Sequence, residues 1–90
     1  MHIIAYDITD DRERLRVSRV LDGYGQRVQA SVYQCVLDAG LKARLRRELD
    51  RLNVETGFIM AWCVQGEEPS FCAGRLPDGV PAKEPRIFII

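Results

Sequence analysis

Apolar residues along the chain recur with a period of either two or about 3.6, and these two patterns separate strands from helices. The run His2–Ile8 is rich in β-branched residues, which predicts a strand. The run Gln26–Leu37 loses its alternation near Ala30 and Ser31, which predicts two short strands joined at a bend or bulge. Residues 56–65 are apolar on both faces, which predicts a central strand covered on both sides.

Two helices are predicted between these strands. The first begins near Asp11 and ends near Asp22, and Asp10 and Glu13 before and within it have the spacing of a capping box. Its buried face is predicted to comprise Val17, Val20, Leu21 and Tyr24. The second helix follows Asp38. Its apolar stripe is predicted to comprise Leu41, Leu45, Leu49 and Leu52.

The order of elements, β-α-β-β-α-β, predicts a single α+β domain with a ferredoxin-like antiparallel sheet and both helices on one face. Residues 1–65 form the predicted core. In the remainder, 66–90, we expect a short hairpin strand at Ser70–Ala73, an irregular loop at Gly74–Pro85 and a terminal strand at Arg86–Ile90. The bare face of the sheet is expected to be covered by a second copy in a twofold dimer.

One carboxylate interrupts the first strand. On a period of two, Asp7 shares a face with Ile3 and Ala5, where an apolar side chain would be expected. A carboxylate at the end of a strand suits a hard cation such as Mg²⁺, so Asp7 is a candidate metal ligand. The alternative is a structural Asp that bonds the backbone of its own turn. Asp10 and Asp11 could assist a metal, although helix capping explains them more simply.

Composition narrows the function only slightly. The 90 residues include 13 Lys and Arg and 13 Asp and Glu, so the net charge is zero. The net charge therefore gives no indication of nucleic-acid binding. The three cysteines are Cys35, Cys63 and Cys72, and they lack CxxC spacing. This argues against both a disulfide framework and a zinc site, and predicts buried or partly buried thiols. No apolar run approaches the roughly 20 residues of a membrane span, and we expect a cytoplasmic protein.

Arginines form one stripe on each predicted helix, and such spaced cations could follow a phosphate backbone. The first stripe is Arg12, Arg16 and Arg19, and the second is Arg44, Arg47 and Arg51. Solvated helix faces are the more common reason for such stripes. His2 is the only histidine and lies at the start of the chain, a position that does not favour a role as general base. Trp62 is predicted to pack in the core rather than to stack on bases.

Two segments together resemble a known family. Tyr6-Asp7-Ile8 at the end of the first strand, and residues 25–33 (Gly-Gln-Arg-Val-Gln-Ala-Ser-Val-Tyr), resemble the CRISPR-associated (Cas) protein two family. The resemblance covers roughly residues 2–65. Residues 58–62 (Phe-Ile-Met-Ala-Trp) are similar to the version found with type I-E systems.

The resemblance implies a homodimer in which Asp7 of each subunit flanks a shared divalent-metal site, with Mg²⁺ as cofactor. It implies either a metal-dependent endonuclease acting on RNA or DNA, or a scaffold that holds DNA for the CRISPR integrase during spacer acquisition. Arg27 becomes the first arginine to assign to nucleic-acid binding, and Ser31 is either a motif hydroxyl near the metal or the bulge residue. Residues 66–90 would dock the integrase.

Two other functions remain open. One is a toxin-like ribonuclease of the related virulence-associated D group, which shares the fold. The other is a non-catalytic ferredoxin-like domain that binds RNA or a small regulatory molecule, although the aromatic signature of RNA-recognition domains is missing.

Overall fold

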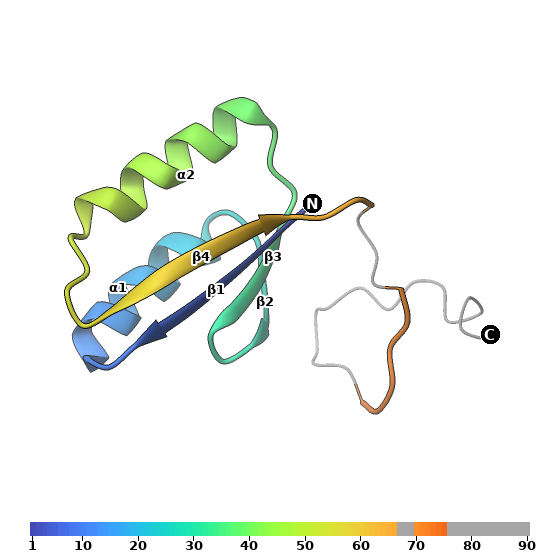
Figure 1. The fold of residues 1–90 in the computed structure, drawn as a ribbon, viewed down its shortest axis with the longest axis horizontal. Helices are drawn as coiled ribbons and strands as arrows, with labels where there is room; N and C mark the ends of the chain where they lie inside the picture. Colours follow the sequence, from blue (N-terminus) through green and yellow to red (C-terminus); the bar gives the residue numbers. More distant parts are fainter. Residues whose placement is uncertain (67–69, 76–90) are drawn as a thin grey trace.

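The structure, a computed structural model, describes residues 1–66 and 70–75. Within these ranges the elements are β1 (His2–Ile8), α1 (Asp11–Asp22), β2 (Gln26–Gln29), β3 (Val32–Cys35), α2 (Ala39–Arg51) and β4 (Gly57–Cys63). The four strands form one antiparallel sheet in the order β2-β3-β1-β4. Both helices lie on the same face of this sheet (Figure 1). The predicted α+β class and ferredoxin-like arrangement are therefore confirmed.

The core lies between the sheet and the helices. Alternate residues of β1 point into it, as the two-residue period of a strand requires. The buried apolar residues are Ile4, Tyr6, Ile8, Val17, Leu21, Tyr33, Cys35 and Leu45. This set includes two tyrosines, so the core contains hydroxyl groups that need hydrogen-bond partners.

Helix α1 has the predicted bounds, and its first turn shows how it is fixed to the rest of the molecule. The Asp10 carboxylate accepts a hydrogen bond from the Glu13 main-chain N–H at 2.9 Å, so Asp10 is the predicted N-cap. Glu13 does not complete a capping box by bonding back to Asp10. Its carboxylate accepts hydrogen bonds from Glu55 and Thr56, in the loop before β4.

Helix α2 is capped by Asp38, whose carboxylate accepts a hydrogen bond from the Leu41 N–H at 2.7 Å. Leu45 is buried, and Leu49 and Leu52 pack against the core. Leu41, by contrast, is 40% exposed, so the predicted apolar stripe is covered only from its second turn onward.

Strands β2 and β3 confirm the prediction of two short strands. They are antiparallel and turn at residues 30–31, and the register shifts between Arg27 and Gln29. The turn at residues 30–31 lies where the loss of alternation predicted the break, whereas the bulge lies within β2 rather than at Ser31.

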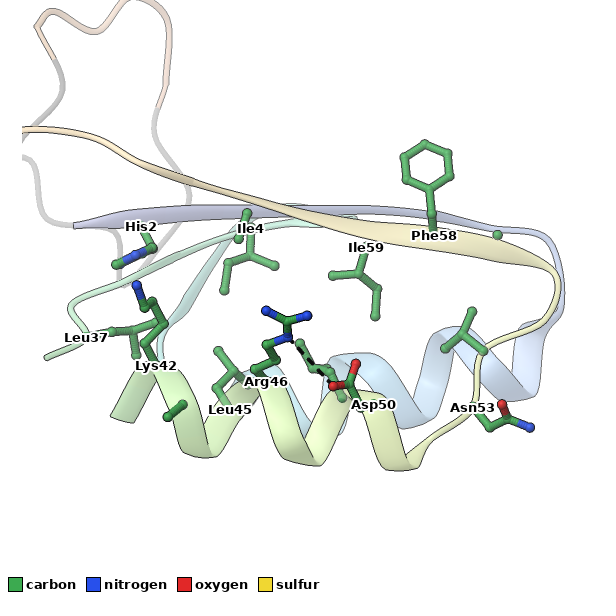
Figure 2. A pocket seen from close by; sticks show the side chains of 15 residues that line it. His2, Ile4, Leu37, Lys42, Leu45, Arg46, Asp50, Asn53, Phe58 and Ile59 are labelled. Atoms are coloured by element: carbon green, nitrogen blue, oxygen red, sulfur yellow. Dashed lines mark ion pairs between the residues drawn. The ribbon is translucent and has the colours of Figure 1, made fainter. Parts of the chain in front are cut away.

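The prediction for β4 was wrong in one respect, because β4 is an edge strand and pairs only with β1 within the described sheet. Phe58, Met60 and Trp62 are 53%, 51% and 49% exposed, so Trp62 is not packed within one chain. Figure 2 shows Phe58 on the opposite side of the strand from Ile59, which points toward α2. On the helix side of β4 only Ile59 packs against the core, and nothing in the described chain covers the other face.

The remaining predictions concern the cysteines and the tail. Cys35 is buried and Cys72 is partly buried, but Cys63 is exposed, contrary to expectation. Ser70–Ala73 contains no strand. Most of the predicted loop, from residue 76, and the predicted strand Arg86–Ile90 lie outside the described residues. No helix in the described ranges has the length and apolar character that a membrane crossing requires.

Candidate metal and nucleic-acid site

Asp7 lies on the open face of the sheet, as the strand period predicted. Ile4, Tyr6 and Ile8 point into the core, while Asp7 is exposed on the other side of β1. Among the described residues, no hydrogen bond or ion pair reaches its carboxylate. The alternative in which Asp7 bonds the backbone of its own turn therefore has no such bond in this part of the chain to support it.

The surroundings of Asp7 on this face are apolar. Phe58 of β4 is paired with Asp7, Met60 with Ala5 and Trp62 with Ile3. Directly paired residues of an antiparallel sheet place their side chains on the same face. The carboxylate therefore stands at one end of an apolar surface, which we call the open-face patch: Ile3, Ala5, Phe58, Met60 and Trp62.

The main chain beyond Asp7 is held partly by side chains. On the β3 side, the Tyr6 N–H donates to the Ser31 carbonyl oxygen at 3.0 Å, which places Ser31 next to this end of β1. Farther along, the Arg14 guanidinium donates to the carbonyl oxygens of Ile8 and Thr9 at 2.8 and 3.0 Å. Arg14 thus donates hydrogen bonds to main-chain oxygens at the end of β1, where β3 no longer pairs with β1.

Among the described residues, one chain supplies a single candidate metal ligand, Asp7. Asp10 is occupied as a cap, and Asp11 pairs with Arg14. The described residues contain no group of three or more His, Cys, Asp or Glu side chains that could hold a metal ion. Mg²⁺ is commonly bound through one or two carboxylates and retains several water molecules. Asp7 fits such a site if a second copy contributes its own Asp7.

Both arginine stripes are exposed, as a phosphate-binding surface requires. The loop at residues 55–56 touches the start of α1, so the two helices run in opposite directions. Arg19 and Arg44 line a groove of about 450 Å³ between them. Arg44 also pairs with Glu48 at 3.5 Å, and Glu48 accepts a hydrogen bond from Tyr24. The groove therefore carries mixed charge, with the arginines at its rim.

Arg27 lies in a different environment from the helix stripes. Its Nε donates to the Tyr33 hydroxyl at 3.0 Å, and its guanidinium lies 5.3 Å from the centre of the Tyr33 ring. The Tyr33 hydroxyl donates to Asp22 at 2.7 Å. This hydrogen bond to the Tyr33 hydroxyl raises the pKa of Arg27. Arg27 thus joins β2 to β3 and α1, and its role in nucleic-acid binding stays a prediction.

A second groove lies on the helix side of the sheet, opposite Asp7. It has a volume of about 840 Å³ and lies between α2 and strands β1 and β4, and Figure 2 shows His2, Lys42 and Arg46 along it. The His2 Nδ1 atom is buried and has no partner among the described residues. Burial, the N-terminal ammonium and Lys42 lower the pKa of His2. A neutral His2 on this face cannot reach the Asp7 carboxylate through the sheet.

Comparison with known proteins agrees with the strand-end motif and the fold. The family model described as CRISPR associated protein Cas2 matches residues 1–66. The chain belongs to the Cas2 family. The match includes Asp7 and all four strands of the sheet.

Relatives named as nucleases support the same assignment. The chain is 37% identical over 79 residues to the CRISPR-associated endonuclease Cas2 2 of Thermus thermophilus. This match covers 87% of this chain and 88% of the relative. It is 45% identical over 51 residues to the CRISPR-associated endoribonuclease Cas2 1 of Chloroflexus aurantiacus, covering 57% of this chain and 55% of the relative. The chain therefore spans nearly all of the first relative and about half of the second.

Two crystal structures share the fold. The hypothetical protein TT1823 of Thermus thermophilus superposes with a TM-score of 0.74 at 36% identity, covering 84% of this chain and 92% of that one. Streptococcus pyogenes Cas2 at pH 6.5 gives a TM-score of 0.62 at 27% identity, covering 70% of this chain and 83% of that one. Both cover most of the Cas2 core described above.

Two residues near Asp7 were not recognised as part of the site from the sequence. Glu13 holds the loop before β4, and Arg14 holds the end of β1. The spacing of Glu13 from Asp10 was the only signal, and it pointed to a local cap rather than to a contact with a loop 42 residues away. Arg14 showed no pattern that distinguished it from the neighbouring arginines.

Proposed function

We propose that the protein is a cytoplasmic, Mg²⁺-dependent nuclease of the CRISPR system whose metal site is formed by Asp7 from two copies of the chain. The observation that carries this proposal is the exposed Asp7 carboxylate, which has no partner in the described chain although it stands beside an apolar surface. A carboxylate next to apolar groups favours binding a cation over remaining alone. The relatives named as endonuclease and endoribonuclease support hydrolysis of nucleic acid.

The residues of this chain would bind and orient the reacting groups. The two Asp7 carboxylates would hold the cation, and their mutual repulsion would be relieved when it binds. Bound Mg²⁺ supplies activation of a water molecule and stabilisation of the developing charge on the phosphate. Ser31, next to this end of β1, is a candidate for a further polar contact.

The second copy is proposed to cover the open-face patch. Large apolar side chains that are half exposed on a flat sheet mark an interaction surface. Because Asp7 stands at the end of the same surface, a twofold axis through the patch would bring the two carboxylates toward each other. One interface would then both bury the apolar surface and complete the metal site.

Nucleic acid is proposed to contact the outer face of the helices. All six stripe arginines are exposed there, and the stripes run along two helices of opposite direction. Contacts to phosphates position a duplex without reading its sequence. In this arrangement the protein could also hold DNA for the CRISPR integrase during spacer acquisition, with residues 66–90 as the docking segment.

The deciding experiment is cleavage of labelled RNA and labelled duplex DNA, with Mg²⁺ or with EDTA. We expect Asp7→Asn to lower the rate at least about 100-fold, because a metal supplies several kcal/mol of transition-state stabilisation and each 1.36 kcal/mol is tenfold in rate. Asp11→Asn is the matched control, since Asp11 is also exposed but pairs with Arg14. If Asp7→Asn cuts as fast as the wild type, the Asp7 metal site is refuted as the source of the activity. If neither substrate is cut, the nuclease is excluded and the DNA-holding role remains.

The dimer has its own test. Met60→Lys places a charge in the middle of the open-face patch, and we expect it to give a monomer with an unchanged circular dichroism spectrum. Sedimentation of the wild type and the variant at equal concentration measures this. Leu15→Lys is the control, because Leu15 is 49% exposed on α1 rather than on the sheet. A Met60→Lys protein with the same sedimentation behaviour as the wild type would place the interface elsewhere.

A further inference from the structure

The end of β1 that carries Asp7 has a paired strand on one side only. Strand β3 pairs with β1 from His2 to Ala5, whereas Asp7 and Ile8 pair with β4 alone among the described residues. The main chain at Asp7 is therefore held in the sheet by the first residues of β4. A shift of the start of β4 would change the direction in which the Asp7 carboxylate points.

The start of β4 lies directly against the main chain of this site. The Thr9 N–H donates to the Thr56 carbonyl oxygen at 3.0 Å. A Cβ atom added at Gly57 would lie 1.9 Å from the Asp7 carbonyl oxygen and 2.7 Å from the Ile8 Cα. Only glycine fits at such a close approach. Residues 56–57 thus set the position of Asp7 through direct backbone contact.

Glu13 in turn holds this loop. Its carboxylate accepts hydrogen bonds from the main-chain N–H groups of Glu55 and Thr56, each at 2.9 Å, and from the Thr56 hydroxyl at 2.5 Å. The Thr56 hydroxyl also accepts a bond from the Asp10 N–H at 3.0 Å. Hydrogen bonds to an ionised carboxylate are about twice as strong as neutral ones. The first turn of α1 is therefore tied to the start of β4 by one charged group.

We propose that Glu13 is a positioning residue that orients Asp7 for binding a divalent cation. This role rests on the proposed metal site. Glu13 acts through residues 55–57 and touches neither the cation nor the nucleic acid. The charge of its carboxylate matters because two main-chain donors and one hydroxyl depend on it, and an amide of the same size would replace one acceptor oxygen with a donor.

The test is a titration of the full-length protein with Mn²⁺, followed by electron paramagnetic resonance of the free ion. Mn²⁺ reports binding directly, without any requirement for cleavage. We expect Asp7→Asn to abolish binding and Glu13→Gln to weaken it about tenfold, which is the low end of the effect of outer-shell changes on metal affinity. Wild-type folding of each variant is verified by circular dichroism before titration.

Asp38→Ala is the matched control. Asp38 is also a carboxylate that accepts a main-chain hydrogen bond at a helix start, but α2 begins after β3, beside the end of the sheet opposite Asp7. Its loss should lower stability and leave Mn²⁺ affinity unchanged. Thr56→Val removes the hydroxyl that donates to Glu13 and accepts from the Asp10 N–H, and it keeps the two main-chain donors to Glu13. It is expected to weaken Mn²⁺ binding severalfold, and it decides the question if Glu13→Gln does not fold.

Each result separates the two proposals. Wild-type affinity in Glu13→Gln, with binding abolished in Asp7→Asn, overturns the positioning role and leaves the metal site intact. An equal loss in Asp38→Ala and Glu13→Gln also overturns it, because the effect then follows stability alone. Equal Mn²⁺ binding in the wild type and Asp7→Asn refutes the metal site itself, and the role of Glu13 falls with it.

Discussion

The Tyr33 hydroxyl joins three parts of the fold, and its removal is a sharp test of how the core is held together. Tyr33 is fully buried on β3. Its hydroxyl accepts a hydrogen bond from Arg27 on β2 at 3.0 Å and donates one to Asp22 at the end of α1 at 2.7 Å. Tyr33→Phe deletes this single oxygen and leaves the ring in place, so the change in unfolding free energy reports the network rather than the packing.

The expected loss is about 2 kcal/mol. A hydrogen bond to a charged group contributes about 1.5 to 3 kcal/mol, and two such bonds are lost. Arg27 and Asp22 are exposed, so water can solvate both charged groups when the hydroxyl is removed. The expected loss in the free energy of unfolding is therefore close to the contribution of one such hydrogen bond. For a domain of this size, each kcal/mol shifts the melting temperature by about 4 to 8 °C, so we expect a drop of about 8 to 16 °C.

Tyr6→Phe is the matched control, because Tyr6 is 6% exposed and its hydroxyl, within the described part of the chain, donates only to the neutral Ala30 carbonyl at 3.1 Å. A neutral bond is expected to contribute about 1 kcal/mol. Urea unfolding of the three proteins at one fixed concentration measures both losses, since the stability of the proposed dimer would depend on concentration. An equal loss in the two variants, or a smaller one in Tyr33→Phe, would refute the reasoning.

Three further predictions use the same unfolding measurement. Burial and the bond to Asp22 raise the pKa of Tyr33 to about 12. As the pH rises, the unfolded chain therefore loses the Tyr33 proton before the folded chain does, and the free energy of unfolding should fall between about pH 10 and pH 12. This fall should have a smaller slope in Tyr33→Phe. The bonds from Thr56 and Glu55 lower the pKa of Glu13, so stability present at neutral pH should fall as the pH drops below about 4.5, and Glu13→Gln should flatten that slope. Gly57→Ala should cost at least about 1 to 3 kcal/mol, because its Cβ would overlap the backbone of β1; an unchanged urea midpoint would contradict this.

The sequence was sufficient for features that depend on neighbouring residues. The bounds of α1 and its cap Asp10 were predicted because a helix start is a local arrangement of a side chain and an N–H three residues later. The face occupied by Asp7 was predicted because side chains in a strand alternate strictly.

Features that depend on distant parts of the chain were missed. The pattern of β4 was the same whether its second apolar face met a helix or lay open, so its edge position could not be predicted from alternation. The contact of Glu13 with Glu55 and Thr56 spans 42 and 43 residues and has no local signal. The same holds for the Tyr33 network, which assembles residues from α1, β2 and β3. Candidate site residues were thus found where the strand period revealed an anomaly, but their supporting contacts were not.

The open-face patch also affects the steady-state amount of folded protein in a cell, because Phe58, Met60 and Trp62 are half exposed. While the chain is monomeric, this surface stays in contact with water, and any partner that binds only the folded chain adds stability in proportion to its occupancy. If the proposed dimer forms, the monomer at low expression would unfold more often and be removed by proteases, whereas at higher concentration dimerisation would protect it. The steady-state level of the protein should therefore rise more steeply than its rate of synthesis.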